Sequence, residues 1–420
     1  MLTGATLALV AMGGLFLLIY HIIPGRISGS VPKEMTIRMQ ILYGGCELVR
    51  MSIICSVIEV IICIIASSFV PWNIMILNIV ISFLILGSLA IAGMARIIII
   101  SKQVGIGKKV LILLLWWVPF VNIILIYQVC KKARLECELE TNICMMDAAR
   151  EENQICKTKY PILMVHGIFF RDWQYFNYWG RIPAELVRNG ATVYYGNQQS
   201  SLSIVESAKE LSRQIQGIIE ETGCGKVNII AHSKGGLDSR YAISCLGSAQ
   251  YVASLTTIST PHYGCAWVDN TIQKAPKPLI KWVEKRYNKV FHKLGDAAPD
   301  FMGGIRDLTV ERAKEFNEKV LDQEGLLYQS VMSQMKKARS GRFPLNVSYR
   351  IIKKSQGSVN DGLVPIESAK WGSYLGILTA SGTRGIGHGD MIDLNRENIA
   401  GFNVREFYVS LIAGLKEKGL

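Results

Sequence analysis

The ten cysteines follow neither the spacing of a disulfide framework nor that of a zinc site, and free thiols favour a reducing compartment. The chain also lacks internal repeats, low-complexity tracts and any nucleic-acid-binding motif. The net charge is +13, and the surplus of lysine and arginine over aspartate and glutamate from residue 157 onward fits attraction to an anionic membrane surface at least as well as to nucleic acid. Apolar residues are in excess, at 50% of the 420 residues with a mean hydropathy of +0.26, which excludes an ordinary soluble enzyme.

The apolar excess is concentrated at the front of the chain. Four hydrophobic runs lie there, each near the length that crosses a bilayer as a helix: residues 5–23, 51–70, 74–95 and 110–130. No lysine or arginine precedes the first run and no small-x-small cleavage site follows it, so we interpret it as a retained span. We predict a multi-pass protein of the cell membrane, with three or four spans in residues 1–130 and a charged, helical connector in 131–156.

The distribution of positive charge leaves two membrane topologies open. Lysine and arginine gather after the first, third and fourth runs, whereas the turn at residues 71–73 has none. If the fourth run, which is broken at residues 116–122, is a re-entrant hairpin, all three basic clusters and the rest of the chain lie in the cytoplasm. With four spans, the rest of the chain lies outside. Glu59 sits within the second run and requires a partner or a proton there.

From residue 157 onward, strand and helix patterns alternate as a parallel sheet requires. We expect helices at 204–221, from Gly235, and at 404–415, and strands at 161–165, 191–195, 227–231 and 252–258. The alternation of apolar residues at 346–352 predicts one more strand. The sequence therefore predicts an α/β fold with a mostly parallel sheet over residues 157–420, with an insertion at about 267–335.

Residues 227–236 join an apolar strand to Ser233, which has small residues two positions to either side, Ala231 and Gly235. A turn from strand to helix in one strained residue exposes the serine hydroxyl and tolerates only small neighbours. This shape is typical of a nucleophile elbow. Ser233 is therefore the candidate nucleophile.

A serine nucleophile needs an imidazole to accept its proton and a carboxylate to orient that imidazole. Asp361 lies in a turn-rich loop downstream, and His388 follows between two glycines. We predict Asp361 as the acid and His388 as the base. Asp390 is the alternative acid, but two residues from His388 in a tight turn it is badly placed to reach the far ring nitrogen.

The strand at 161–165 runs into His166-Gly167-Ile168, where a glycine lets backbone N–H groups turn toward a developing negative charge. We predict that the backbone N–H groups of Ile168 and Lys234 form an oxyanion hole. Only the backbone of Lys234 is needed for this role, so its side chain need not take part.

At these residues the chain resembles the bacterial triacylglycerol lipase family of α/β-hydrolases. Five motifs carry the resemblance over roughly residues 157–420: H-G-I-F-F at His166, A-H-S-K-G-G around His232, S-T-P-H-Y-G at Ser259, N-D-G-L-V-P at Asn360 and H-G-D-M at His388. The resemblance implies an α/β-hydrolase fold, the triad Ser233, Asp361 and His388, and Ile168 and Lys234 as oxyanion donors. The sequence departs from the family at Phe170, where such lipases often have a second glycine, and at Ala231, where many have glycine.

Some members of this family bind structural calcium through an aspartate two residues after the catalytic histidine, which here is Asp390. No aspartate between Asp322 and Asp361 matches the usual second ligand, and calcium requires several oxygen ligands, so we predict no metal and no cofactor. The aromatic residues beside the oxyanion loop, among them Phe169, Phe170 and Tyr178, are expected to contribute to an acyl site. His262 is expected to line the cleft.

Within the insertion, apolar residues from Leu279 to Leu294 fall on one helical face and lysines on another. Such a basic amphipathic helix suits the boundary of an anionic membrane and resembles a lipase lid. An ordinary surface helix is the alternative. We expect a membrane-anchored serine hydrolase that cleaves carboxylic esters, most simply those of lipids, and whose partners are the ester substrate and the bilayer, with no nucleic acid. Acyl transfer by the same triad and a non-catalytic membrane scaffold are the alternatives, and the oligomeric state stays open.

Overall fold

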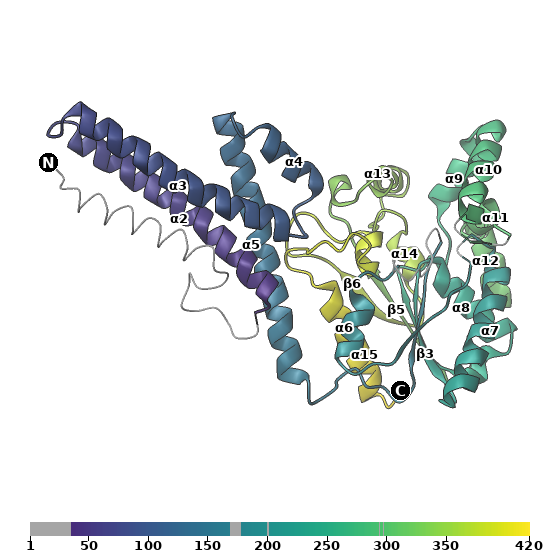
Figure 1. Cartoon of the computed structure of the whole chain (residues 1–420). Helices are drawn as coiled ribbons and strands as arrows, with labels where there is room; N and C mark the ends of the chain where they lie inside the picture. Colours follow the sequence, from purple (N-terminus) through teal and green to yellow (C-terminus); the bar gives the residue numbers. More distant parts are fainter. Residues whose placement is uncertain (1–34, 169–177, 200, 294, 297) are drawn as a thin grey trace. The chain divides into compact units, whose positions relative to one another are not determined.

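The chain divides into two compact units in the computed structural model, Met1–Ala149 and Arg150–Leu420 (Figure 1). The structure describes residues 35–168, 178–199, 201–293, 295–296 and 298–420. The first hydrophobic run lies outside the described residues, as do Phe169 and Phe170.

In the first unit, helices α2 (Ile37–Ala66) and α3 (Trp72–Ile100) form an antiparallel hairpin. The two backbones approach closely at a pair of glycines, because a Cβ atom added to Gly93 would lie 2.7 Å from the carbonyl oxygen of Gly45. Small residues at such a crossing are typical of helices that pack within a membrane. The amide of Asn78 in α3 donates a hydrogen bond to the carboxylate of Glu59 in α2, so this carboxylate has the partner that its apolar surroundings require.

Both helices of this hairpin are long and apolar enough to cross a membrane, and they are the two in the described part of the chain that meet this condition. Only 6% of the most apolar stretch of α3 is covered by other parts of the protein. Its isoleucine and leucine side chains, such as Ile76, Leu77 and Leu84, are therefore exposed along most of the helix.

The fourth hydrophobic run is divided between α4 (Ile106–Leu114) and the beginning of α5 (Pro119–Arg150). The nine residues of α4 extend over only about 13 Å, too short for a bilayer core of about 30 Å. Ile112 of α4 belongs to the same apolar cluster as Leu125 and Val129 of α5, so the chain turns back and packs on itself. This geometry agrees with the re-entrant alternative.

A buried carboxylate in the middle of α5 connects three helices of this unit. Glu136 of α5 is 1% exposed and accepts hydrogen bonds from the Arg38 guanidinium at 2.7 Å and the Ser101 hydroxyl at 2.6 Å. It also accepts from the backbone N–H groups of Lys102 and Gln103, each at 3.2 Å. The start of α2, the end of α3 and the middle of α5 therefore lie at the same end of the unit.

The second unit is built on six parallel strands in the order β2-β1-β3-β4-β5-β6 (Figure 1). The strands are β1 (Ile162–Val165), β2 (Val193–Tyr195), β3 (Val227–His232), β4 (Val252–Ile258), β5 (Leu327–Ser333) and β6 (Ser373–Leu378). Strands β3 and β4 at the centre are buried along their whole length, as expected of a parallel sheet that is covered on both faces.

Helices cover both faces of this sheet. One face packs against α6 (Ile182–Arg188) and α15 (Val404–Glu417), and the other against α7 (Ile204–Thr222) and α8 (Lys234–Cys245). Helix α7 illustrates why the sequence folds this way: its buried residues Ile204, Ala208, Leu211 and Ile215 recur every three or four positions. The arrangement is that of an α/β-hydrolase.

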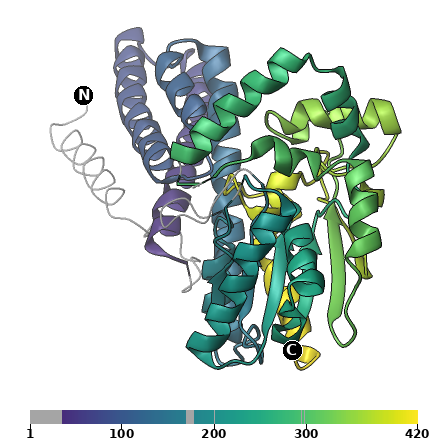
Figure 2. The same cartoon turned by 90° about the vertical axis from the view of Figure 1, so that its right-hand side faces the viewer.

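Four further helices connect β4 to β5: α9 (Ala266–Lys274), α10 (Lys277–Lys293), α11 (Phe301–Arg306) and α12 (Val310–Lys319). Figure 2 shows α10 as the long green helix across the upper part of the view. Residues 327–333, at the end of the predicted insertion, form β5 instead. After β5 come α13 (Leu345–Gln356), α14 (Ile366–Ala369) and the short helix η3 (His388–Ile392).

The strand predicted at 346–352 is wrong, because these residues lie within α13. The side chains buried there are Ser348 and Ile352, which are four positions apart, whereas Val347 and Ile351 are 46% and 41% exposed. Gly357 ends the helix in the left-handed conformation. The apolar alternation was therefore incidental to a helix that buries a different face. The strands predicted at 161–165, 191–195, 227–231 and 252–258 are confirmed within one or two residues.

Candidate active site

The turn between β3 and α8 holds Ser233 in a conformation that residues with side chains rarely adopt, with φ of +55° and ψ of −131°. The Ser233 N–H donates to the carbonyl of Ile258 at 2.9 Å, and the Thr260 hydroxyl donates to the Ser233 carbonyl at 2.8 Å. A Cβ atom added to Gly235 would lie 2.8 Å from the carbonyl oxygen of Val165. The strained backbone and the need for a small residue two positions later are both features of a nucleophile elbow.

The candidate acid and base are joined directly. His388 Nδ1 lies 2.8 Å from Asp361 Oδ2, and the His388 backbone N–H donates to the Asp361 carbonyl at 2.9 Å. Asp361 is fully buried, and its other carboxylate oxygen accepts from the backbone N–H groups of Leu363 at 3.0 Å and Val364 at 2.8 Å. The carboxylate is therefore fixed by its own loop and fixes one ring nitrogen of His388, which leaves Nε2 for another partner.

His388 lies beside the elbow. Its ring centroid is 4.4 Å from that of His232, the residue that directly precedes Ser233. Both histidines are buried, at 6% and 1% exposure. The loops after β3, β5 and β6 thus bring the candidate nucleophile, acid and base to the carboxyl ends of the strands, where parallel sheets place their sites.

The candidate oxyanion loop lies against the nucleophile. A Cβ atom added to Gly167 would come within 2.8 Å of the Ser233 Cβ, so the close approach of the two loops requires glycine. His166 stabilises the loop locally, because its ring nitrogens lie 2.8 Å from the carbonyl oxygens of Gly167 and Gln198. Ile168 follows at the end of β1, and Lys234 begins α8, where the first N–H groups have no partner within the helix.

The Lys234 side chain points away from this chemistry. It is 2% exposed, and its ammonium donates to the Ser207 hydroxyl at 3.0 Å and to the Asp238 carboxylate at 2.7 Å. Burial raises the pKa of Asp238 to about 7, although the Lys234 charge opposes that shift. The side chain therefore anchors the first turn of α8 to α7, which is compatible with a backbone role for Lys234.

Tyr178 is a residue of this site that the sequence reasoning assigned only to a possible acyl pocket. It is 3% exposed, and its hydroxyl accepts from the Gly167 N–H at 3.0 Å and lies 2.7 Å from His232 Nδ1. Burial and the neighbouring His388 lower the pKa of His232 well below its usual range, so this ring is neutral. The Tyr178 hydroxyl thus connects the oxyanion loop to the elbow.

Two other predicted residues have partners that point to structural roles. His262 is fully buried and stacks on Trp371, and its ring nitrogens lie near the Arg240 guanidinium and the Thr257 hydroxyl. This placement does not support the expectation that His262 lines a substrate cleft.

Asp390 accepts from the backbone N–H of Gly387 at 2.8 Å and from the Arg384 guanidinium at 3.1 Å. Both carboxylate oxygens therefore accept hydrogen bonds that stabilise the turn carrying His388, and the Arg384 guanidinium already provides a positive charge beside this carboxylate. This supports Asp361 rather than Asp390 as the acid, and it gives Asp390 a structural role.

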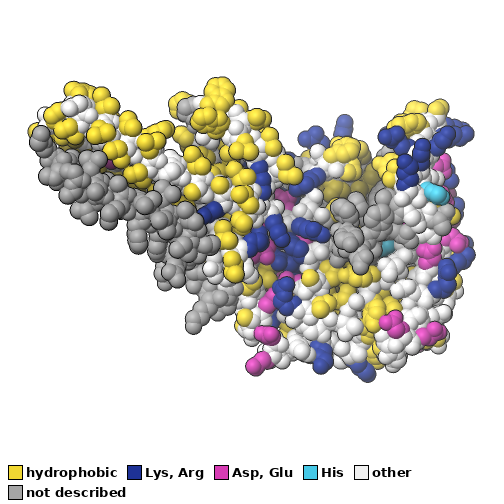
Figure 3. Space-filling model, viewed as in Figure 1, with side chains coloured by type: hydrophobic (Ala, Val, Ile, Leu, Met, Phe, Trp, Pro, Cys, Tyr) yellow, Lys and Arg dark blue, Asp and Glu magenta, His cyan; other side chains and the backbone are white. Residues whose placement is uncertain are grey.

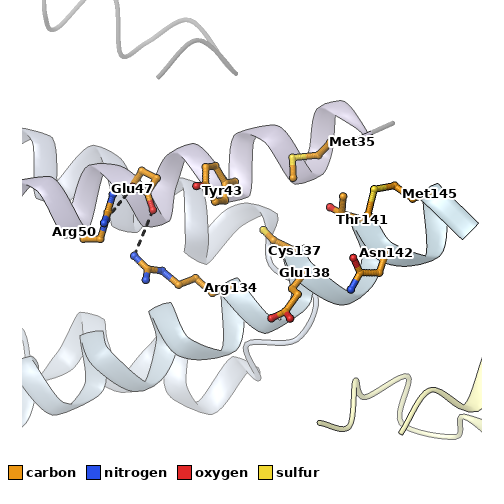
Figure 4. Close-up of a pocket in the computed structure, with 10 residues that line it drawn as sticks. All are labelled: Met35, Tyr43, Glu47, Arg50, Arg134, Cys137, Glu138, Thr141, Asn142 and Met145. Atoms are coloured by element: carbon orange, nitrogen blue, oxygen red, sulfur yellow. Dashed lines mark hydrogen bonds and ion pairs between the residues drawn. The ribbon is translucent and has the colours of Figure 1, made fainter. Parts of the chain in front are cut away.

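A separate cavity of about 490 Å³ lies in the first unit, between α2 and α5 (Figure 4). Glu47 projects toward it and forms ion pairs with Arg50 and Arg134. None of the residues that line this cavity is a candidate catalytic residue.

The chain is similar to known lipases in both sequence and structure. It is 32% identical to a triacylglycerol lipase of Burkholderia plantarii over 182 residues, which cover 40% of this chain and 50% of the relative. It is 33% identical to a triacylglycerol lipase of Pseudarthrobacter phenanthrenivorans over 172 residues, covering 38% of this chain and 53% of the relative. The chain thus spans about half the length of the curated relatives it matches.

The crystal structure of Staphylococcus hyicus lipase is similar at a TM-score of 0.50 with 18% sequence identity, and the match covers 62% of this chain and 97% of that one. This likeness supports a shared fold. A family model described as "Putative serine esterase (DUF676)" matches residues 159–370, which is half of the chain. The chain therefore belongs to this serine esterase family.

Proposed function

We propose that this protein is a membrane-anchored serine hydrolase that cleaves carboxylic esters, with lipids as its substrate class. The observation that carries the proposal is the 2.8 Å contact between His388 and Asp361, made beside the strained turn that presents Ser233. Membership of a serine esterase family and similarity to proteins named triacylglycerol lipases support the same reaction and substrate class.

In the proposed reaction, His388 Nε2 accepts the proton of the Ser233 hydroxyl as its oxygen attacks the ester carbonyl. The backbone N–H groups of Ile168 and Lys234 stabilise the negative charge that develops on the carbonyl oxygen. His388 then donates the proton to the leaving alcohol, and an acyl group remains on Ser233. A water molecule then gives a proton to His388 and attacks the acyl carbonyl, and His388 returns that proton to the Ser233 oxygen as the acid leaves. Asp361 stabilises the charged imidazole in both halves of the reaction.

The neutral His232 suits this mechanism. A second charged imidazole 4.4 Å from His388 would repel the imidazolium that forms during catalysis. Burial keeps His232 uncharged, and the Tyr178 hydroxyl occupies its Nδ1 atom. His232 therefore does not compete with His388 for the serine proton.

Membrane anchoring is the second part of the proposal. Helices α2 and α3 cross the bilayer as a hairpin, and α4 with the start of α5 enters and leaves it on one side. The Glu136 network supports this topology, because it gathers Arg38, Lys102 and the basic part of α5 at one end of the unit. Positive residues mark the cytoplasmic side of a membrane, and no further candidate span follows α5 in the described residues. The hydrolase unit accordingly faces the cytoplasm.

A fluorophosphonate probe tests the hydrolase directly, since it reacts with an activated serine. We expect rapid labelling of the detergent-solubilised full-length protein at Ser233 and none in the Ser233→Ala variant. Ser239→Ala is a suitable control, because Ser239 lies on the same helix and its hydroxyl donates to the backbone carbonyl of Gly235 within that helix. Absence of labelling in every lipid environment would favour a non-catalytic scaffold.

Protease treatment of intact cells tests the topology independently. With a tag after Leu420, the cytoplasmic arrangement predicts that the tagged unit resists protease until the membrane is opened. Cleavage of the tagged unit from outside would remove the re-entrant arrangement and leave the esterase assignment untouched.

A further inference from the structure

Helix α10 is attached to the hydrolase unit by one face only. Phe291 is 4% exposed, and the Tyr287 ring stacks on that of Phe301 with centroids 4.5 Å apart. The Asn288 side chain accepts a hydrogen bond from the Phe301 N–H at 3.0 Å. These contacts with the start of α11 orient α10 and determine which of its side chains face solvent.

The opposite face carries large apolar side chains that are about half exposed. Leu279, Trp282 and Val290 are 50%, 59% and 47% exposed. Trp282 lies on the same face as Arg286, Lys289 and Lys293, because these positions recur every three or four residues. The Arg286 guanidinium lies 5.7 Å from the Trp282 ring. Apolar and cationic groups therefore lie side by side on one surface, and Figure 3 shows both kinds of side chain at the upper right, in the region of α9 and α10.

The charge of this helix is not neutralised by ion pairs with the part of the chain that the structure describes. Helix α10 contains six lysine or arginine residues and one glutamate, Glu284, which lies on the attached side. None of the six forms an ion pair with a described residue. Other surface helices differ: Lys209 in α7 pairs with Glu206, and Arg312 in α12 pairs with Glu315. Such a surface is complementary to an external partner with negative charge.

We propose that the outer face of α10 docks on the headgroup region of an anionic lipid bilayer. Lysine and arginine attract anionic headgroups, and tryptophan is preferred at the boundary between headgroups and acyl chains. A nucleic acid or an acidic protein would satisfy the charges but would leave Leu279 and Val290 without an apolar environment. The proposed cytoplasmic orientation agrees with this partner, because the cytoplasmic leaflet carries the anionic lipids. Docking holds the hydrolase unit against the membrane in addition to its covalent connection through α5.

Hydrogen–deuterium exchange of the full-length protein tests this proposal without reference to esterase activity. The protein is placed in nanodiscs of phosphatidylcholine alone or of phosphatidylcholine with phosphatidylglycerol. We expect slower exchange of residues 277–293 in the anionic nanodiscs. Because each cation near an anionic surface contributes about fivefold to association, the variant K285E/R286E/K289E should weaken docking on the order of 100-fold and abolish the difference.

Two further variants separate the contribution of the α10 charges to this protection from that of the Trp282 side chain. K209E/R213E/K226E makes the same change of charge on α7 and the turn after it, and it should retain the protection of α10. Trp282→Ala keeps every charge and should reduce the protection. Equal exchange in both kinds of nanodisc, or protection that survives the α10 charge reversal, overturns the proposal. The proposal would also be overturned by two results together: residues 277–293 stay fully protected in Trp282→Ala, and a soluble RNA oligonucleotide protects them equally well. These results would identify a polyanion as the partner.

Discussion

The Tyr178 hydroxyl connects the two halves of the candidate site, and its removal has a defined expected effect. In Tyr178→Phe, the Gly167 N–H and His232 Nδ1 both lose a partner that lies 3.0 and 2.7 Å away. A buried polar group without a partner costs about 1–3 kcal/mol, so the loss of two partners should make the variant less stable by roughly 2–6 kcal/mol. The loop that carries Ile168 also loses one of its attachments.

The kinetic effect should fall on the chemical step. An oxyanion donor contributes on the order of 100-fold or more to kcat, and displacement of the loop forfeits part of this contribution, so we expect kcat to fall about 10- to 100-fold. KM should change little, because the hydrogen bonds from the oxyanion loop to the substrate oxygen strengthen only in the transition state. Hydrolysis of a short p-nitrophenyl ester gives both constants, and thermal unfolding followed by circular dichroism gives the change in stability.

Tyr408→Phe provides the matched control. Tyr408 is also fully buried, but its hydroxyl has no hydrogen-bond partner among the described residues. Its removal should leave kcat unchanged and stability equal or slightly higher. If Tyr178→Phe behaves like Tyr408→Phe in both assays, the inferred connection between the oxyanion loop and the elbow is wrong.

Three other changes test separate parts of the site. Asp361→Asn should lower kcat about 10⁴-fold while leaving the circular dichroism spectrum unchanged, because the amide favours the wrong tautomer of His388; activity within tenfold of the parent would exclude Asp361 as the acid. Gly167→Ala should abolish fluorophosphonate labelling, since the added carbon would lie 2.8 Å from the Ser233 Cβ; labelling at the parent rate would contradict the close packing of the two loops. The fold raises the pKa of Asp238 to about 7, so this group favours folding most below pH 4 and its contribution declines as the pH rises through 7. Asp238→Asn should therefore flatten the fall in unfolding temperature between pH 4 and 7, and an unchanged slope would contradict the assignment.

The sequence was most informative where local patterns determine structure. Ser233 and its small neighbours predict a strained turn because only such residues fit it, and the spacing of apolar residues predicts α7 from Ile204 onward. The buried strands β1, β3 and β4 were also predictable, because a short apolar run between turn residues is typical of a buried strand in an α/β fold.

Features that depend on distant contacts could not be predicted. The role of Tyr178 depends on Gly167 and His232, which only the tertiary fold brings to its hydroxyl. The spacing of Lys234 and Asp238 allows an ion pair on a helix, but not the conclusion that the pair is buried. Strand β6 was missed because its residues alternate between exposed and half-buried positions and are interrupted by Gly376, which weakens the strand pattern.

The division of the fourth hydrophobic run illustrates the same limit. Hydropathy identifies residues 110–130 as apolar, but it cannot distinguish one helix from a short helix followed by the start of a longer one. The break before Pro119 and the packing of Ile112 on Leu125 in the three-dimensional structure favour the hairpin.

The central claim is that Ser233 forms a covalent acyl intermediate with the help of His388. The most direct measurement is the mass of the full-length protein mixed with a p-nitrophenyl ester and quenched in acid within milliseconds. We predict an added acyl group on the peptide that contains Ser233, formed in a burst with p-nitrophenol and absent from Ser233→Ala. An ester that is hydrolysed at the same rate by Ser233→Ala, or an acyl group found on another residue, would contradict the account.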